Sequence, residues 1–481
     1  MAKRLIEKSE LKRKIHNALR AWKNVDGVDG DVLSDLLLVR QRRDREMLTT
    51  LIPAVALRLA ANDILLEGLD LLKDQNEVNA NILRDRFLTG QKTEQVANKI
   101  GFSTDTVNRK QREGLEMLTE LVWQMEEDAR ARRVEQMLEQ LPLPTYSRLF
   151  GVEEKLAKLV EQLLGGEGVA YITAVEGMGG LGKTAMVDAA MRQVIPALHY
   201  ERIFWVSVPR PMLLGQSSDS PEHMFGRIIH SLAQQIWPGQ PLSLIPSEQQ
   251  AQVEMLLKET ACLVVIDNLE KPSDVAYLLE RLPLMTQPSR FLLTSRTNVQ
   301  MGQTAVYRLL LNELSLQDAE SLMRHHAHQQ GSTMLDDAVP EDFDDIYKLT
   351  GGNPLALKMV VDLLDRFPLT QLLSGFSTSH VERINVEVYD RIYQHTWQTL
   401  SEDAKLLLQA MPLIAQSGAT PDYLRRMTEL DADVLWAAIQ ELLTRSLIES
   451  RGSLRERRYG IHQLTDSFVQ RKIIGEGGTA A

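Results

Sequence analysis

Residues Gly177–Thr184 read GMGGLGKT, and this stretch decides the fold. It matches the pattern G-x-x-x-x-G-K-[S/T], with a β-rich run before it and a helix-forming run after it. The glycines let backbone N–H groups curve around an anion, and the following helix adds its positive N-terminal end. We expect Lys183 to reach the terminal phosphates and the Thr184 hydroxyl to help hold Mg²⁺. The stretch therefore predicts a nucleotide-binding phosphate loop.

Short apolar runs surround this loop and alternate with helical segments. After the run VAYITAVEG come RIFWVSV, ACLVVIDN, RFLLTSR and the weaker candidate AVYRLLL. Strands separated by helices predict a mostly parallel sheet with helices on both faces.

Two of these runs end on a charged residue. Asp267 ends LVVID, where phosphate-loop proteins carry an acid that holds Mg²⁺; a helix cap or turn is the alternative. Asn268 follows instead of a second acid, so Glu270 is the candidate base and we expect slow hydrolysis. Arg296 ends FLLTSR, and its planar guanidinium suits a γ-phosphate; a solvated surface arginine is the alternative.

Length and composition indicate a multidomain globular protein. The 481 residues suggest three or four domains, and 44% apolar with 25% charged residues is typical of a globular protein. The single cysteine, Cys262, excludes an intramolecular disulfide and fits a reducing compartment. The N-terminus is too polar for a signal peptide and no apolar run approaches a membrane span, so we expect a cytoplasmic protein without membrane contact.

The net charge of −11 is unevenly distributed. Residues 1–140 contain 24 Lys and Arg against 24 Asp and Glu, so the whole acidic excess follows residue 140. A neutral, arginine-dotted N-terminal third approaches nucleic acid more easily than the acidic remainder does.

The N-terminal third is predicted to be helical, with a helix-turn-helix at about residues 80–120. Ser103 is a good N-cap after the turn Gly101–Ser103, while Ala97 and Val107 suit the small and the buried β-branched positions of such a motif. The stretch resembles the helix-turn-helix of sigma-factor region four. The resemblance implies a DNA-facing set on the second helix: Thr104, Asp105, Asn108, Arg109, Lys110 and Arg112. A helical module that binds another protein is the alternative, because Asp105, Glu113 and Glu116 dilute the positive face.

Taken in order, the motifs of residues 145–470 resemble the NB-ARC branch of the STAND ATPases. They are SRLFGVEEKLAKL, GMGGLGKT, FWVSVP, LVVIDNLE, FLLTSRT, GGNPLALKMV and LLTRSLIES…RYGIHQLTDSFV. The resemblance implies that ATP or ADP binds with Mg²⁺ and that Phe150, Gly151 and Val152 hold the adenine. The resemblance also implies that Pro354 packs against the adenine and that His462 contacts the β-phosphate of ADP. Its loop residues are Gly177, Met178, Gly179, Gly180, Leu181, Gly182, Lys183, Thr184 and Ala185.

The chain departs from the family pattern at Asn268, where a second acid is common, and at Ile461 and Gln463, where Met and Asp flank the histidine. The expected multidomain layout has a helical N-terminal effector domain at 1–140 and a phosphate-loop α/β domain with a parallel sheet at 145–310. A helical subdomain follows at 311–385, and a C-terminal winged helix at 386–481.

The function expected from this resemblance is a nucleotide-dependent switch that hydrolyses ATP slowly and, when activated, forms a homo-oligomer or exposes residues 1–135 to DNA or a partner. Transcriptional regulation and antiviral defence both fit. Because no sensor repeats follow the winged helix, we expect a separate protein to deliver the signal. The alternatives are an AAA+-like remodelling ATPase acting on DNA and a nucleotide-bound scaffold without turnover.

Overall fold

The computed structural model describes most of the chain in two compact units, Met1–Leu138 and Glu139–Ala481. The described residues are 7–22, 33–46, 53–165, 169–208, 220–243, 245–269, 271–296, 305–364, 367–376, 393–394, 396–398, 400–414, 418–445, 447–452, 457–461 and 463–470.

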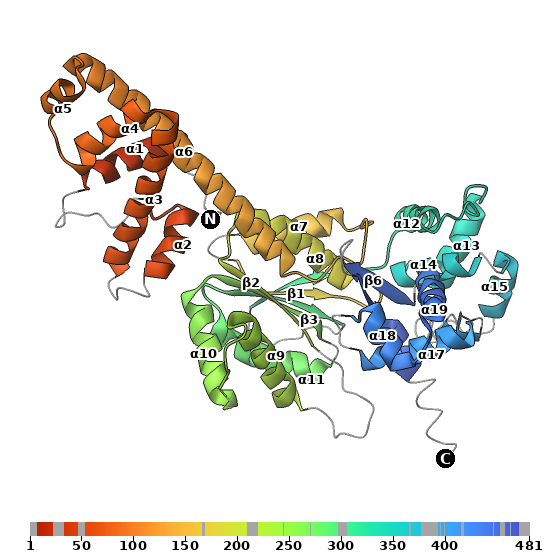
Figure 1. Cartoon of the computed structure of the whole chain (residues 1–481). Coiled ribbons are helices and arrows are strands. Elements are labelled where there is room, and N and C mark those ends of the chain that lie inside the picture. Colours follow the sequence, from red (N-terminus) through yellow and green to blue (C-terminus); the bar gives the residue numbers. More distant parts are fainter. Residues whose placement is uncertain are drawn as a thin grey trace. The chain divides into compact units, whose positions relative to one another are not determined.

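The first unit is helical, as the sequence predicts (Figure 1). Its elements are α1 (Lys8–Arg20), α2 (Leu37–Glu46), α3 (Pro53–Gln75), α4 (Glu77–Leu83), the π-helical turn η1 (Arg84–Leu88), α5 (Thr93–Ile100) and α6 (Thr104–Glu139). Leu11, Ile15 and Leu19 recur at four-residue spacing on α1 and are fully buried. They share one core with Leu65 of α3 and Leu118 of α6.

A buried carboxylate on α6 organises the start of α2. Glu126 is 2% exposed, and its two oxygens accept the backbone N–H groups of Leu37 and Leu38 at 3.0 and 3.1 Å. These are donors that a helix leaves unsatisfied at its N-terminus. Arg130 donates to the same carboxylate at 2.8 Å, which balances its charge. A residue 89 positions away thus caps α2.

The second unit begins with a parallel sheet in the strand order β2-β3-β4-β1-β5. The strands are β1 (Ile172–Glu176), β2 (Arg202–Ser207), β3 (Cys262–Leu269), β4 (Arg290–Ser295) and β5 (Val306–Leu310). The fifth strand, the weakest in the sequence, is confirmed beside β1 in parallel register. The connecting elements are α7 (Glu153–Leu164), α8 (Lys183–Val194), η2 (Ile195–Ala197), α9 (Pro221–Ile236), α10 (Pro246–Glu259), α11 (Pro272–Arg281) and η3 (Leu282–Met285).

Helices cover both faces of this sheet (Figure 1). Alternating strand residues such as Phe204, Val264 and Leu293 pack against Ile228 of α9 and Val275 of α11, while α7 and α8 lie on the other face. Because the strands are parallel, their carboxyl ends meet at one edge, where ligands bind in open α/β sheets. The phosphate loop, Asp267 and Arg296 all lie at that edge.

The rest of the second unit is mainly helical. It contains α12 (Leu316–Gln329), α13 (Pro340–Thr350), α14 (Pro354–Leu364), α15 (Leu369–Phe376), α17 (Glu402–Ala410), η5 (Met411–Leu413), α18 (Pro421–Thr428), α19 (Ala432–Thr444) and α20 (Gln463–Phe468). The expected charged hairpin is confirmed as the antiparallel pair β6 (Ile448–Gly452) and β7 (Arg457–Ile461). Met323 of α12, Val360 of α14, Leu407 of α17 and Leu442 of α19 belong to a single buried cluster. The helices on either side of residue 385 therefore share one hydrophobic core.

Candidate nucleotide site

The phosphate loop joins β1 to α8, and its lysine forms hydrogen bonds with the backbone of the same loop. The Lys183 ammonium donates to the carbonyl oxygens of Gly177 and Met178 at 2.8 and 2.7 Å. Gly180 adopts a φ of +81°, and a Cβ there would lie 2.7 Å from Oδ1 of Asn353. A side chain at this position is excluded both by the left-handed backbone and by its neighbour.

The start of α8 fits an anion. Its N-cap, Gly182, supplies no side-chain hydrogen bond, and no acidic residue lies in the first turn. The backbone N–H groups and the positive end of the helix are therefore not satisfied by a carboxylate of the helix itself. Thr184 is exposed one residue into the helix. These features suit a phosphate group held by the loop backbone.

Asp267 lies where the sequence expects a metal ligand. It is 6% exposed, and its Oδ1 accepts hydrogen bonds from the hydroxyls of Thr184 at 2.9 Å and Thr294 at 2.6 Å. The first contact joins β3 to the phosphate loop, and the second joins it to β4. Within the described part of the chain no three His, Cys, Asp or Glu side chains cluster as a metal site. The donors fit Mg²⁺, which takes one or two carboxylates together with substrate phosphates.

Thr294 is a site residue that sequence reasoning missed. It is 1% exposed on β4, and besides donating to Asp267 it accepts the backbone N–H of Asn268 at 2.8 Å. The available signal was a hydroxyl at the end of an otherwise apolar strand next in the sheet, FLLTS, since a buried hydroxyl needs a partner.

The backbone conformation at residue 268 suits an asparagine. The pairing of β3 with β4 shifts register between Ile266 and Leu269, and Asn268 has a φ of +77°. Asparagine is among the few residues enriched in this left-handed conformation. Its side-chain amide donates to the carbonyl of Val208 at 3.4 Å, toward β2.

Arg296 follows β4 directly and is half-buried, with its backbone N–H donating to the carbonyl of Leu269 at 3.1 Å. Burial raises the pKa of the Tyr393 phenol, while the hydrogen bond from Thr465 and the charge of Arg296 act in the opposite direction. The guanidinium of Arg296 therefore lies close enough to Tyr393 for its charge to act on the phenol.

An asparagine links the phosphate loop to the helices that follow the sheet. Asn353 is 1% exposed, and its amide nitrogen donates to the carbonyl of Gly179 at 2.9 Å. Its side-chain oxygen accepts the N–H groups of Leu355 and Ala356 at 3.0 and 3.4 Å, which caps α14. Sequence reasoning singled out Pro354, the first residue of α14, and missed the asparagine before it. The signal was Asn followed by Pro, a typical start of a helix.

The expected adenine segment packs beside α12 and α14. Phe150 is 8% exposed and shares a buried cluster with Leu322 and Leu355. Gly151 has a φ of +65°, and a Cβ there would lie 2.7 Å from the carboxylate of Asp318. Val152 is buried just before α7.

A bidentate ion pair holds the strand that leads into the loop. Glu176 ends β1 and is 2% exposed, and its two carboxylate oxygens accept from Nε and Nη2 of Arg308 on β5 at 2.8 and 2.6 Å. Two of the predicted site residues, Glu270 and His462, lie outside the described residues.

The expected DNA-facing residues lie together on the first turns of α6. Thr104, Asn108, Arg109 and Arg112 are exposed, and Lys110 is half-buried. The Ser103 hydroxyl accepts the N–H of Thr106 at 3.2 Å, so the predicted N-cap is confirmed. Arg109 donates to Glu113 at 2.6 Å, and the Lys110 ammonium lies 5.8 Å from the Phe102 ring centre. Among the described residues, no helix is long and apolar enough to span a membrane.

Comparison with known proteins agrees with this geometry. The family model of the NB-ARC domain matches residues 152–331. Two similar curated proteins of Arabidopsis thaliana are the probable disease resistance RPP8-like protein 4, at 24% identity over 59% of this chain, and the disease susceptibility protein LOV1, at 26% over 52%. The matches span 30% and 26% of those proteins' own length.

A similar solved structure is the Signal Transduction ATPase with Numerous Domains (STAND) protein PH0952 of Pyrococcus horikoshii, which has a tetratricopeptide repeat sensor. Its TM-score is 0.43 at 18% identity, over 68% of this chain and 43% of that chain. The DNA-bound ORC1 protein of Aeropyrum pernix has a TM-score of 0.33 at 16% identity, over 69% of this chain and 95% of that chain. The family match and the geometry of the loop and its neighbouring strands lead to one conclusion: this chain carries an NB-ARC domain, which spans residues 152–331.

Proposed function

We propose that the chain is a STAND-type molecular switch that rests with ADP and is activated by ATP. The observation that carries this proposal is the position of Asn353, which donates to the phosphate-loop carbonyl of Gly179 and also caps α14. A rearrangement of the loop on phosphate binding is thereby transmitted to the first turn of a helix outside the sheet. A two-state element of this kind is what a ligand-driven switch requires.

Each loop residue has a defined part in this proposal. Lys183 exchanges the carbonyls of Gly177 and Met178 for phosphate oxygens, because an ammonium prefers an anionic acceptor. Thr184 and Asp267 hold Mg²⁺, and Thr294 keeps the carboxylate oriented. ATP supplies the phosphoanhydride bond, and Mg²⁺ neutralises the charge on its phosphates.

Arg296 and His462 are the proposed sensors of nucleotide state. The charge of Arg296 acts on Tyr393, so moving this guanidinium onto a γ-phosphate would change the electrostatic environment of that phenol. His462 is proposed to contact the β-phosphate of ADP, on the family resemblance alone.

Slow hydrolysis follows from the residue after Asp267. Asn268 directs its amide to Val208, and its backbone N–H is bonded to Thr294, so this position holds no general base. Glu270 is left as the proposed base. Measurement of steady-state ATPase activity separates the alternatives: rapid, DNA-stimulated turnover would favour an AAA+-like remodelling enzyme. Full function of Lys183→Ala would favour a scaffold.

We further propose that residues 386–481 form a winged-helix lid rather than a second DNA-binding module. The order α17, α18, α19 and hairpin β6–β7 suits a winged helix, in which α19 is the recognition helix. From Ala432 to Thr444 this helix contains Asp433 and Glu441 and no lysine or arginine. Such a helix is repelled by phosphates and suits contact with protein.

The output is proposed to come from the N-terminal unit. Its exposed residues Thr104, Asn108 and Arg112 suit contact with DNA, while the pairing of Arg109 with Glu113 leaves partner-protein binding as the second candidate. The plant relatives are described as disease resistance and susceptibility proteins, which supports defence signalling over transcriptional control. A separate sensor protein, a cytoplasmic setting and ATP-dependent self-assembly complete the proposal.

One experiment tests the proposal at its base. Purified full chain is denatured and its nucleotide identified by chromatography. We expect stoichiometric ADP, lost in Lys183→Ala. A protein that purifies without bound nucleotide, and that binds neither ADP nor ATP in the presence of Mg²⁺, would contradict the proposed switch.

A further inference from the structure

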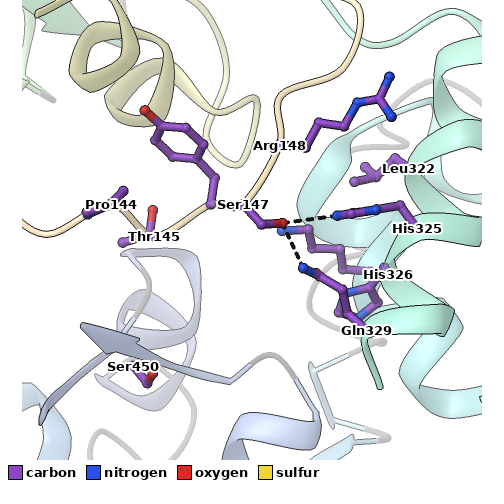
Figure 2. A pocket seen from close by; sticks show the side chains of 11 residues that line it. Pro144, Thr145, Ser147, Arg148, Leu322, His325, His326, Gln329 and Ser450 are labelled. Carbon is purple, nitrogen blue, oxygen red and sulfur yellow. Dashed lines mark hydrogen bonds between the residues drawn. The ribbon is translucent and has the colours of Figure 1, made fainter. Parts of the chain in front are cut away.

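A separate cavity lies within the second unit, between four parts of the chain (Figure 2). Its volume is about 370 Å³, which falls in the range of small-molecule sites. The lining comes from the segment 144–148, from one face of α12, from Lys358 of α14 and from Ser450 of β6. No residue of the phosphate loop lines it.

The segment 144–148 forms one wall of the cavity, and hydrogen bonds of Tyr146 and Ser147 hold it in place. The Tyr146 hydroxyl donates to Asp188 of α8 at 2.8 Å, and Arg192 donates to the same carboxylate at 2.8 Å. Burial raises the pKa of the Tyr146 phenol, and the contact with Asp188 raises it further, so the hydroxyl remains a donor. This part of the cavity is therefore preorganised.

The next residue ties the same segment to α12. The Ser147 hydroxyl lies 3.0 Å from Nε2 of His325 and accepts from the amide of Gln329 at 2.7 Å, as Figure 2 shows. With Gln329 donating, the hydroxyl has one proton and one lone pair left. It can therefore donate to neutral His325 or accept from the protonated form, and both forms keep the contact.

The ionisable side chains of the described lining, apart from the Tyr146 phenol, are basic, although the chain as a whole carries a net charge of −11. Arg148, His325, His326 and Lys358 all line the cavity. Asp362 of α14 accepts a hydrogen bond from His326 at 2.6 Å, so this imidazole is already paired with a carboxylate.

We propose that this cavity is a second anion site, which binds the phosphate group of a small phosphorylated ligand through Arg148, His325 and Lys358. A guanidinium and an ammonium are the groups proteins use for phosphate, and the imidazole adds a third donor. Thr145, Ser147 and Ser450 supply neutral hydroxyls for the remainder of the ligand. The site does not depend on the phosphate loop or on the proposed switch.

Proton binding is linked to occupancy at this site. Burial lowers the pKa of His325, and the positive charges of Arg148, Lys358, His326 and His328 lower it further. A bound dianion offsets these charges and raises the pKa, so His325 takes up a proton as the ligand binds. Affinity is therefore highest at acidic pH and falls as pH rises through the pKa of the occupied site.

The probe is sulfate, titrated by isothermal calorimetry into the full chain at pH 6.0 and 8.0. Sulfate remains a dianion across this range, so any pH dependence comes from the protein. With the phosphate loop saturated by ADP and Mg²⁺, we expect one sulfate site whose affinity falls about tenfold or more between the two pH values, and inorganic phosphate should compete for it. His325→Gln should bind sulfate weakly at pH 6.0 and abolish the pH dependence.

Matched variants locate the site. Arg148→Gln and Lys358→Gln should each weaken sulfate about tenfold or more, as expected for a charged hydrogen bond. Lys348→Gln removes the same charge from α13 outside the cavity and should bind sulfate like the wild type. Arg148 is exposed, so its variant remains informative if Lys358→Gln does not fold. Sulfate affinity that is unchanged in both cavity variants would overturn the proposal.

Discussion

Thr294 shows how one hydroxyl can organise the edge of the sheet where we propose that Mg²⁺ binds. It donates to the buried carboxylate of Asp267 and accepts the backbone N–H of Asn268, so it contacts both residues at the register shift of β3. The left-handed backbone of Asn268 is therefore supported by a residue of the neighbouring strand.

Thr294→Val should therefore lower the free energy of unfolding by about 1–3 kcal/mol, because it leaves the buried carboxylate and the Asn268 N–H without their shared partner. Mg²⁺-dependent nucleotide affinity should fall with it. Chemical denaturation and calorimetry measure the two effects. Thr173→Val, on β1 and equally buried, is the control. Equal effects of the two variants would show that Thr294 has no special role.

Asn353 offers a second residue-scale prediction, because its two functions can be separated. Asn353→Ser retains an N-cap oxygen for α14 but lacks the amide that reaches Gly179, whereas Asn353→Ala lacks both. The serine variant should stay within about 1 kcal/mol of wild-type stability yet release ADP faster. Stopped-flow exchange of a fluorescent ADP analogue measures the rate. Wild-type release by Asn353→Ser would remove the loop-to-helix link from the mechanism.

At the scale of elements, the turn between α5 and α6 depends on a left-handed glycine. Gly101 has a φ of +72°, and an added Cβ would meet no atom within 4 Å. Gly101→Ala should thus cost only the backbone strain, roughly 1–2 kcal/mol, and Gly101→Asn less. Thermal unfolding measures both. Equal losses for the two variants would mean that packing, not the backbone, sets the requirement.

Much of the architecture could be predicted from the sequence at this scale. The alternation of apolar runs and helices gave five strands in a parallel sheet, because buried parallel strands are continuously apolar and differ in length from helices. The contacts that cap α2 and close the loop could not be predicted. Glu126 and Asn353 act across 88 or more residues, and a single sequence carries no signal for such long-range pairs.

The candidate site likewise contains residues that the sequence predicts and residues that it does not. The phosphate loop and Asp267 follow from local patterns, since glycine spacing and a strand-ending acid have a fixed chemical meaning. Thr294 and the cavity beside Tyr146 depend on which strands and helices become neighbours. Only the strand order β3-β4-β1 puts the hydroxyl of Thr294 beside Asp267.

For the N-terminal unit as a whole, DNA binding is testable through its salt dependence. Arg112→Gln should weaken binding of duplex DNA and lower the slope of log affinity against log salt by about 1, since one phosphate contact is lost. Arg132→Gln, exposed further along α6, is the matched control. Fluorescence anisotropy at several salt concentrations measures the slope. If both variants behave alike, or the wild type does not bind, the unit serves protein partners.

The proposed switch couples nucleotide state to assembly of the whole molecule, and a measurement of mass tests this coupling directly. The molar mass of the protein is measured by light scattering after size-exclusion chromatography, once with ADP and once with ATP, each with Mg²⁺. A monomer that retains ADP and forms a larger, defined species with ATP supports the switch, and Asn353→Ser should need more ATP for the same shift. An unchanged mass in both nucleotides, together with fast steady-state turnover, would contradict it.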